Sequence, residues 1–162
     1  MPDRAPNSTS DHANVLLPPP ALFGGALLVG LALDWFLGWH LPMPLFARSL
    51  LAIILIMLGA VPLGAALYTL NKARTAIVPW HSTKRIIDSG PYRFTRNPIY
   101  VGMILIYLGL VIWLGSGTGF LLLLPVLFML HFGVVLREEV YLARKFGEEY
   151  TAYCQQTPRW LQ

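Results

Sequence analysis

Residues 90–114 read "GPYRFTRNPIYVGMILIYLGLVIWL", in which a polar, turn-forming start opens into an almost wholly apolar run. Asn97 is a residue type that caps helix N-termini, and Pro98 suits the first helical turn, so the stretch predicts a helix over 98–114. Its apolar part is a little shorter than the ~20 residues that cross the hydrocarbon core of a bilayer. The stretch therefore predicts a short membrane-spanning helix that begins at a polar entrance.

Three further apolar stretches predict membrane-spanning helices. The first follows the prolines at 18–20, which we expect to lie before the helix. The segments "HLPMP" (40–44) and "GSGTG" (115–119) have the composition of turns, so we expect two helical hairpins. "GSGTG" also matches glycine-rich nucleotide-binding loops, but these follow a strand, and we interpret it as a turn. The four predicted helices cover about 21–39, 45–70, 98–114 and 120–136.

The composition is that of a membrane protein. Apolar residues make up 56% of the 162 residues and charged residues only 12%, which is half of the roughly 25% typical of soluble domains. The predicted fold is therefore an all-α, polytopic membrane helix bundle with a single domain over 15–162. The preceding residues 1–14 are polar and rich in proline, and we expect a disordered tail there.

Basic residues are concentrated on one side of the predicted bundle. The loop 71–97 carries six Lys and Arg residues against the single acidic Asp88, and the two predicted hairpin turns carry none. The positive-inside rule then places this loop, the N-terminal tail and the C-terminus in the cytoplasm. Residues 137–162 mix aromatic and charged side chains, which predicts a cytoplasmic amphipathic helix that is broken near Gly147.

The bilayer is the predicted partner, and we expect neither a metal site nor nucleic acid binding. One cysteine and four widely spaced histidines do not match the ligand spacing of structural zinc sites. The oligomeric state is left open. Two polar residues inside predicted helices each have two open interpretations. Asp34 either forms a polar site between helices or lies near the interface beside Trp35, and His131 either faces a cavity or makes a hydrogen bond in packing.

The polar entrance contains more than a helix start requires. Capping and turn formation explain Asn97, Pro98 and the "SGP" turn at 89–91, but not the arginines and tyrosines around them. A helix N-terminus attracts anions, and adjacent arginines strengthen that attraction. Gly102, one turn into the helix, would let a ligand approach the backbone closely. The entrance therefore suits a ligand with a carboxylate or phosphate and a flat or cationic part for the tyrosines.

A second polar cluster, Glu138 and Glu139, follows the fourth predicted helix. Two carboxylates at a helix C-terminus oppose the helix dipole, so they are locally unfavourable and suggest a function. Because the third and fourth helices are predicted to form a hairpin, the two glutamates should face the entrance residues 92–100 across one site.

These residues resemble the isoprenylcysteine carboxyl methyltransferase family and its phospholipid methyltransferase relatives. The resemblance rests on three blocks in the same order and at similar spacing, and it covers roughly residues 70–162. The blocks read "GPYRFTRNPIYVG", "REEVYL" and "FGEEYTAY" in this sequence.

The resemblance implies that S-adenosylmethionine, the methyl donor, binds at the cytoplasmic membrane face under the C-terminal tail. Asn97 stands where eukaryotic members have histidine, and an amide cannot act as an acid or base. Val134 stands where those members have arginine, which argues against a prenylcysteine carboxylate as the acceptor. The tail residues implied to cover the donor include Tyr153. The predicted donor-binding residues are Tyr92, Arg93, Arg96, Asn97, Pro98, Tyr100, Gly102, Glu139, Tyr150 and Arg159, and the predicted catalytic residues are Glu138 and Arg96.

The predicted function is a membrane methyltransferase that uses S-adenosylmethionine and a lipophilic, membrane-resident acceptor with a carboxylate, amine or hydroxyl. Glu138 would remove a proton from an amine or hydroxyl, whereas a carboxylate needs no base. An NADPH-dependent membrane reductase of related fold is an alternative, but those enzymes carry glutamate where this chain has Met103. A non-enzymatic membrane scaffold is the other alternative.

Overall fold

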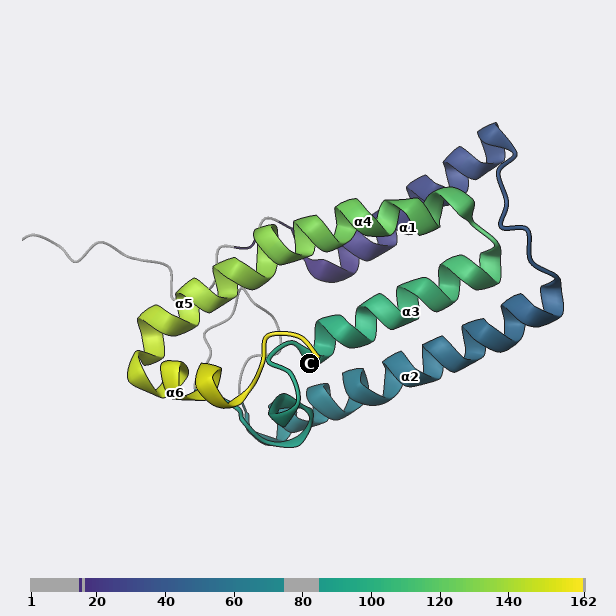
Figure 1. Ribbon diagram of the computed structural model, residues 1–162. Coiled ribbons are helices and arrows are strands. Elements are labelled where there is room, and N and C mark those ends of the chain that lie inside the picture. Colours follow the sequence, from purple (N-terminus) through teal and green to yellow (C-terminus); the bar gives the residue numbers. More distant parts are fainter. Residues whose placement is uncertain (1–14, 16, 75–84, 162) are drawn as a thin grey trace, which may run out of the picture.

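The computed structural model describes residues 15, 17–74 and 85–161, and this part of the chain is helical with no strand (Figure 1). The predicted all-α membrane bundle is confirmed. Three helical stretches in the described chain are long and apolar enough to cross a membrane, and the remaining predicted span, 98–114, is shorter at 17 residues. The predicted disordered tail lies outside the described residues. The four main helices are α1 (Pro19–Leu37), α2 (Leu45–Lys72), α3 (Pro98–Leu114) and α4 (Gly117–Leu130).

The helix starts differ from the predicted ones where proline and glycine are involved. α1 begins at Pro19, so the prediction that the prolines precede this helix was wrong. Proline fits the first helical turn because its missing N–H has no partner there in any case. α4 begins at Gly117, three residues earlier than predicted, because the Ser116 hydroxyl caps it by accepting from the Gly119 N–H at 2.9 Å.

The fourth helix does not end at 136 as predicted. It passes through a π-helical turn, η2 (His131–Val135), and continues as α5 (Leu136–Phe146). A change from apolar to charged residues does not by itself stop a helix, and residues 134–146 contain no glycine or proline. The predicted break near Gly147 is confirmed, because this residue has φ +53° and separates α5 from α6 (Glu148–Gln156).

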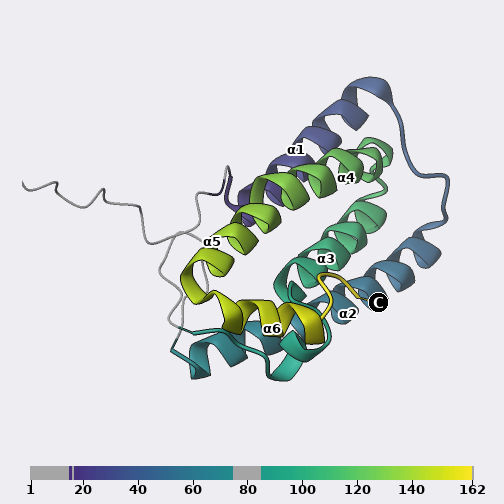
Figure 2. The same ribbon diagram turned by 60° about the vertical axis from the view of Figure 1, so that its left-hand side comes forward.

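The helices do not pair as two consecutive hairpins. α2 packs along α3, and α1 packs along α4, so the predicted hairpin of the first two helices was wrong (Figure 2). Glycines explain the pairing of α2 with α3. A Cβ atom on Gly59 would lie 2.6 Å from the Gly102 carbonyl oxygen, and one on Gly102 would lie 2.7 Å from that of Gly59. Such close backbone approach is the usual means of helix packing in membranes.

Asp34 joins α1 to the start of α4. Its buried carboxylate accepts hydrogen bonds from the Ser116 hydroxyl and, at 2.9 Å, from the Thr118 N–H. A carboxylate is favourable at a helix N-terminus, where free N–H groups point outwards. Of the two open interpretations of Asp34, the structure supports a polar contact between helices. This contact positions α1 against the start of α4.

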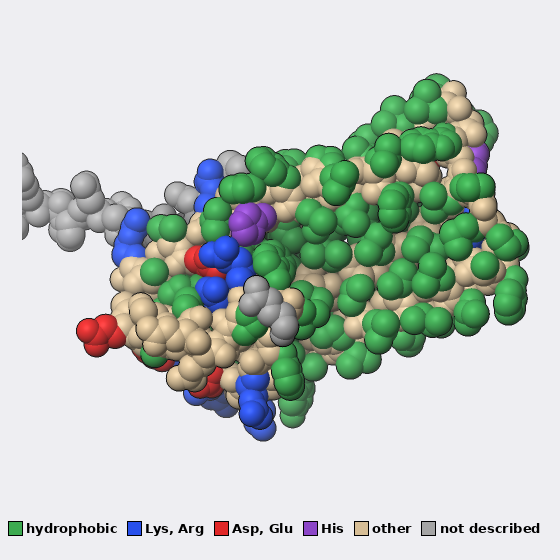
Figure 3. Space-filling view, in the orientation of Figure 1, with side chains coloured by type: hydrophobic (Ala, Val, Ile, Leu, Met, Phe, Trp, Pro, Cys, Tyr) green, Lys and Arg blue, Asp and Glu red, His purple; other side chains and the backbone are tan. Residues whose placement is uncertain are grey.

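Apolar side chains cover the long helices, while charged side chains gather at the end formed by α5 and α6 (Figure 3). At the opposite end, large aromatic side chains are exposed, including Trp35 at 85%, Phe36 at 82% and Phe46 at 79%. Aromatic residues of this kind are typical of the membrane–water interface. The distribution agrees with a bundle that crosses a bilayer along its helix axes.

Candidate functional site

Segments that are far apart in the sequence meet at the charged end of the bundle (Figure 2). They are the short helix η1 (Gly90–Arg93), the start of α3, the helices α5 and α6, and the C-terminal residues 157–161. η1 is held against α2, because the Tyr92 ring is buried in a cluster with Ala66 and Leu70. As the sequence predicted, the start of α3 and the end of the α4 helix are brought together.

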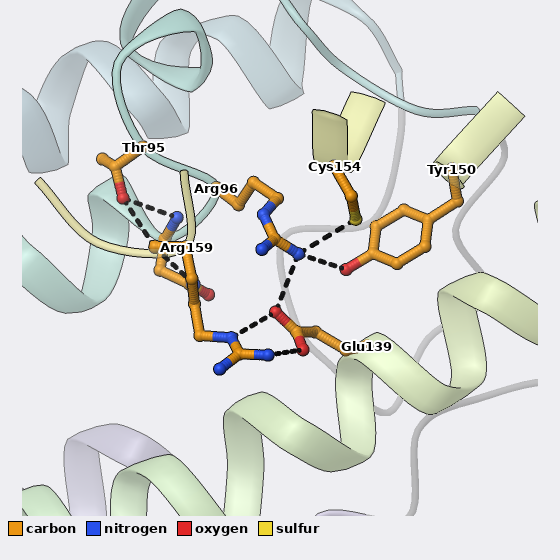
Figure 4. Close-up of polar contacts among 7 residues, drawn as sticks. Thr95, Arg96, Glu139, Tyr150, Cys154 and Arg159 are labelled. Atoms are coloured by element: carbon orange, nitrogen blue, oxygen red, sulfur yellow. Dashed lines mark hydrogen bonds and ion pairs between the residues drawn. The ribbon is translucent and has the colours of Figure 1, made fainter. Parts of the chain in front are cut away.

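Glu139 lies at the centre of this site, between two arginines (Figure 4). Arg159 donates to both of its carboxylate oxygens, at 2.8 Å from Nε and 2.7 Å from Nη2. Arg96 Nη1 donates to Oε1 at 2.9 Å. The hydrogen bond to Glu139 is also the main reason why the pKa of Arg159 is raised. Two cations share one carboxylate, so this group of three residues carries a net charge of +1.

Arg96 is also bound by α6. Its Nη1 donates to the Tyr150 hydroxyl at 3.3 Å and to the Cys154 sulfur at 3.0 Å. Tyr150 and Cys154 are four residues apart on one helix and therefore lie on the same face. Burial raises the pKa of the Tyr150 phenol, which keeps it protonated at neutral pH. The Nε atom of Arg96 is buried and has no hydrogen-bond partner among the described residues.

The C-terminal segment lies over the start of α3. The Arg159 carbonyl accepts hydrogen bonds from the Thr95 hydroxyl at 2.9 Å and the Asn97 side-chain amide at 3.0 Å. The Arg96 N–H donates to the Pro158 carbonyl at 2.9 Å. Asn97 occupies the N-cap position, but its side chain makes no capping hydrogen bond. The predicted capping role was therefore wrong, because the amide is turned towards the returning C-terminal backbone.

Glu138 has a different environment from its neighbour. Its carboxylate accepts a hydrogen bond of 2.6 Å from the Tyr100 hydroxyl, and within residues 15, 17–74 and 85–161 no salt bridge to it is found. Tyr100 is buried, and Glu138 is partly buried. Of the two acids, Glu139 is therefore neutralised by arginines, whereas Glu138 accepts a hydrogen bond from a neutral phenol.

Two more tyrosines attach α6 to η1. The Tyr153 hydroxyl donates to the Tyr92 carbonyl at 2.9 Å. Both phenols are neutral at neutral pH, and burial raises their pKa further above it. α6 is thus fixed to the same loop that supplies Arg96.

The remaining predicted site residues lie outside this network. Arg93 is exposed on η1, and Pro98 is fully buried in the first turn of α3. Gly102 faces α2, and the two helices approach so closely there that a side chain would not fit. Two residues that sequence reasoning did not select belong to the site: Thr95 and Cys154. The spacing of Cys154 from Tyr150 was the available signal, whereas Thr95 is recognised only from its hydrogen bond to the Arg159 carbonyl.

Comparison with known proteins adds independent information. A sequence model of the family described as phospholipid methyltransferase matches residues 47–149, which include all but the first two residues of α2 and the whole of α3, α4 and α5. An uncharacterised protein of Haemophilus influenzae is 36% identical over 63 residues, which are 39% of this chain and all of that protein. No solved structure matches the chain.

Proposed function

The chain belongs to the phospholipid methyltransferase family, and from this premise we propose that it transfers a methyl group from S-adenosylmethionine to a lipophilic acceptor in the membrane. Membership in the family makes it a membrane methyltransferase. The identity of the donor and the class of the acceptor are the proposal. The observation that carries it is the group of Arg96, Glu139 and Arg159 at the membrane edge, with its net positive charge.

The residues of this group fit the proposed donor. S-adenosylmethionine has a carboxylate, a positively charged sulfur and a flat adenine, and when bound it supplies an electrophilic methyl group. Arg96 and Arg159 would hold the carboxylate, because the Arg96 Nε lacks a partner within the described chain and Arg159 is 36% exposed. The oxygens of Glu139, the sulfur of Cys154 and the neutral phenol of Tyr150 all contact Arg96.

Glu138 is the residue that we place beside the acceptor. With an amine or hydroxyl acceptor it would take the proton, because no arginine neutralises it among the described residues. Tyr100 would keep the carboxylate oriented through its hydrogen bond. A carboxylate acceptor would need no base and would be repelled by an unpaired carboxylate. The environment of Glu138 therefore favours an amine or a hydroxyl.

We also propose that the site and both termini are cytoplasmic. Basic residues lie at the helix ends near the site: Lys72 in the last turn of α2 with Arg74 just after it, Arg85, which donates to the Ala73 carbonyl, and Arg144 in the last turn of α5. A water-soluble donor would then reach the site from the cytoplasm, and a lipophilic acceptor from the bilayer. A fluorescent reporter fused after Gln162 should be protected from protease added outside intact cells, and its digestion there would refute this orientation.

Calorimetric titration of the purified full chain with S-adenosylmethionine, and separately with NADPH, tests the proposal. We expect heat of binding with the methyl donor and none with NADPH. The converse result would favour a membrane reductase, and no heat with either at millimolar concentration would favour a scaffold. Incubation with radiolabelled donor and a total membrane lipid extract, followed by chromatography, would then show which lipid carries the label.

A further inference from the structure

His131 is a polar residue at the membrane side of the site that the proposed donor binding does not use. It begins the π-helical turn η2, whose Leu136 N–H donates to the His131 carbonyl. Its ring lies edge-on to Phe132, with centroids 4.8 Å apart, and 6.3 Å from the ring of Trp160. Single π-helical turns inside α-helices are frequent at functional sites.

The C-terminal segment connects His131 to the donor site. Arg159 binds Glu139, and the next residue, Trp160, packs beside His131 and against the main core cluster. Two adjacent residues of this segment, Arg159 and Trp160, thus contact the long fourth helix at Glu139 and at His131. His131 lies towards the apolar α4, seven residues or about 10 Å along the helix from Glu138 at 1.5 Å per residue.

The imidazole of His131 makes no hydrogen bond within residues 15, 17–74 and 85–161, and its contacts there are with the rings of Phe132 and Trp160. The residue is partly exposed, and its ring nitrogens are not among the buried side-chain atoms without a partner. A polar side chain in an apolar helix costs free energy unless a partner compensates it. An accessible imidazole offers one donor and one acceptor to such a partner.

We propose that His131 is a specificity-determining residue for the methyl acceptor, which rests on the proposed function above. It hydrogen-bonds a second polar group of the acceptor, about 10 Å from the atom that is methylated beside Glu138. Trp160 and Phe132 form the apolar surroundings of that contact. The acceptor is therefore an amphiphile with two polar groups at this separation, followed by an apolar tail.

The test uses the purified full chain in detergent with four sequences: wild type, His131→Leu, His131→Gln and His40→Ala. Each is titrated with detergent-dispersed total membrane lipid extract at saturating radiolabelled S-adenosylmethionine, and donor affinity is measured separately by calorimetry. His40 is the control, because it is an exposed histidine near the opposite end of the bundle, where its ring hydrogen-bonds the Gly38 carbonyl and its backbone bridges to Ser116.

We expect His131→Leu to raise the lipid concentration for half-maximal labelling about five- to tenfold, as for the loss of one hydrogen bond. The donor dissociation constant should stay within twofold of the wild type. His131→Gln, which keeps a hydrogen-bonding group, should recover most of the loss, and His40→Ala should behave as the wild type.

An unchanged half-maximal lipid concentration in His131→Leu would overturn the inference. A parallel loss of donor affinity in both His131 variants would overturn it as well, because that result indicates a structural role. If His131→Leu does not fold, His131→Gln decides, since the inference requires it to fold and to label lipid. If the wild type itself binds no donor, the proposed function fails first, and the inference falls with it.

Discussion

The Tyr100 hydroxyl donates a 2.6 Å hydrogen bond to the Glu138 carboxylate, although the two residues belong to helices that are joined only at the opposite end of the bundle. The neighbouring Glu139 is instead bound by two arginines. Adjacent residues of the same type thus have different electrostatic environments. We expect this difference to separate proton transfer at Glu138 from donor binding at Glu139.

Replacement of Glu138 by Gln tests the first of these roles. The amide can still accept the Tyr100 hydrogen bond, but it cannot take a proton from the acceptor. With an amine or hydroxyl acceptor, we expect the turnover rate to fall at least about 100-fold, as for the loss of a general base. The donor dissociation constant, measured by calorimetry, should change less than threefold. Full turnover by the variant with such an acceptor would remove Glu138 from proton transfer.

Tyr100→Phe removes the hydroxyl that holds Glu138. We expect the turnover rate to fall about tenfold and the free energy of unfolding to fall by about 1 kcal/mol. Tyr107→Phe is a matched control, because the buried Tyr107 hydroxyl donates at 2.8 Å to the Gly119 carbonyl near the opposite end. The control should lose similar stability and keep its turnover rate. Equal turnover in both variants would show that Tyr100 contributes only to stability.

Arg96→Ala removes one of the two cations that share Glu139. We expect donor affinity to fall more than about tenfold, since hydrogen bonds between charged groups contribute about 1.5–3 kcal/mol each. The control is Arg144→Ala, which removes an exposed arginine of α5. Calorimetric titration of both variants with S-adenosylmethionine gives the comparison. Undiminished donor affinity in Arg96→Ala would exclude the arginine pair as the carboxylate site.

Gly102→Ala separates helix packing from ligand approach. The added Cβ would lie 2.7 Å from the Gly59 carbonyl oxygen, so we expect α2 and α3 to separate slightly and the melting temperature to fall. In contrast, Gly64→Ala adds a Cβ with no atom within 4 Å and should raise helix stability by about 0.5–1 kcal/mol. Loss of donor affinity in Gly102→Ala without a change in melting temperature would show that Gly102 contributes to donor binding.

Local sequence patterns determined the helices themselves. The bounds 98–114 agree with the structure at both ends, because Pro98 starts the helix and Gly115, with φ +69°, ends it. The break at Gly147 has the same kind of local cause. The start of α1 and the continuation of α4 into α5 were predicted less well. At those places the sequence permits more than one helix end, and packing selects among them.

Only the tertiary structure decided which helices pair and which side chains of the site bind one another. All four helices are apolar around most of their circumference, so hydropathy alone contains little information about their partners. The contact of Gly59 with Gly102 and the binding of Asp34 to the start of α4 select the pairs. In the site, Asn97 looks like a cap in the sequence, yet it donates to the Arg159 carbonyl, 62 residues away.

Composition and short-range spacing thus determined a membrane helix bundle with a polar site at one end. The difference between Glu138 and Glu139 arose only when Tyr100, Arg96 and the C-terminal segment were folded around them. The reason is physical: backbone conformation depends on neighbours within a few residues, whereas the charge state and partners of a side chain depend on groups that the fold brings from elsewhere.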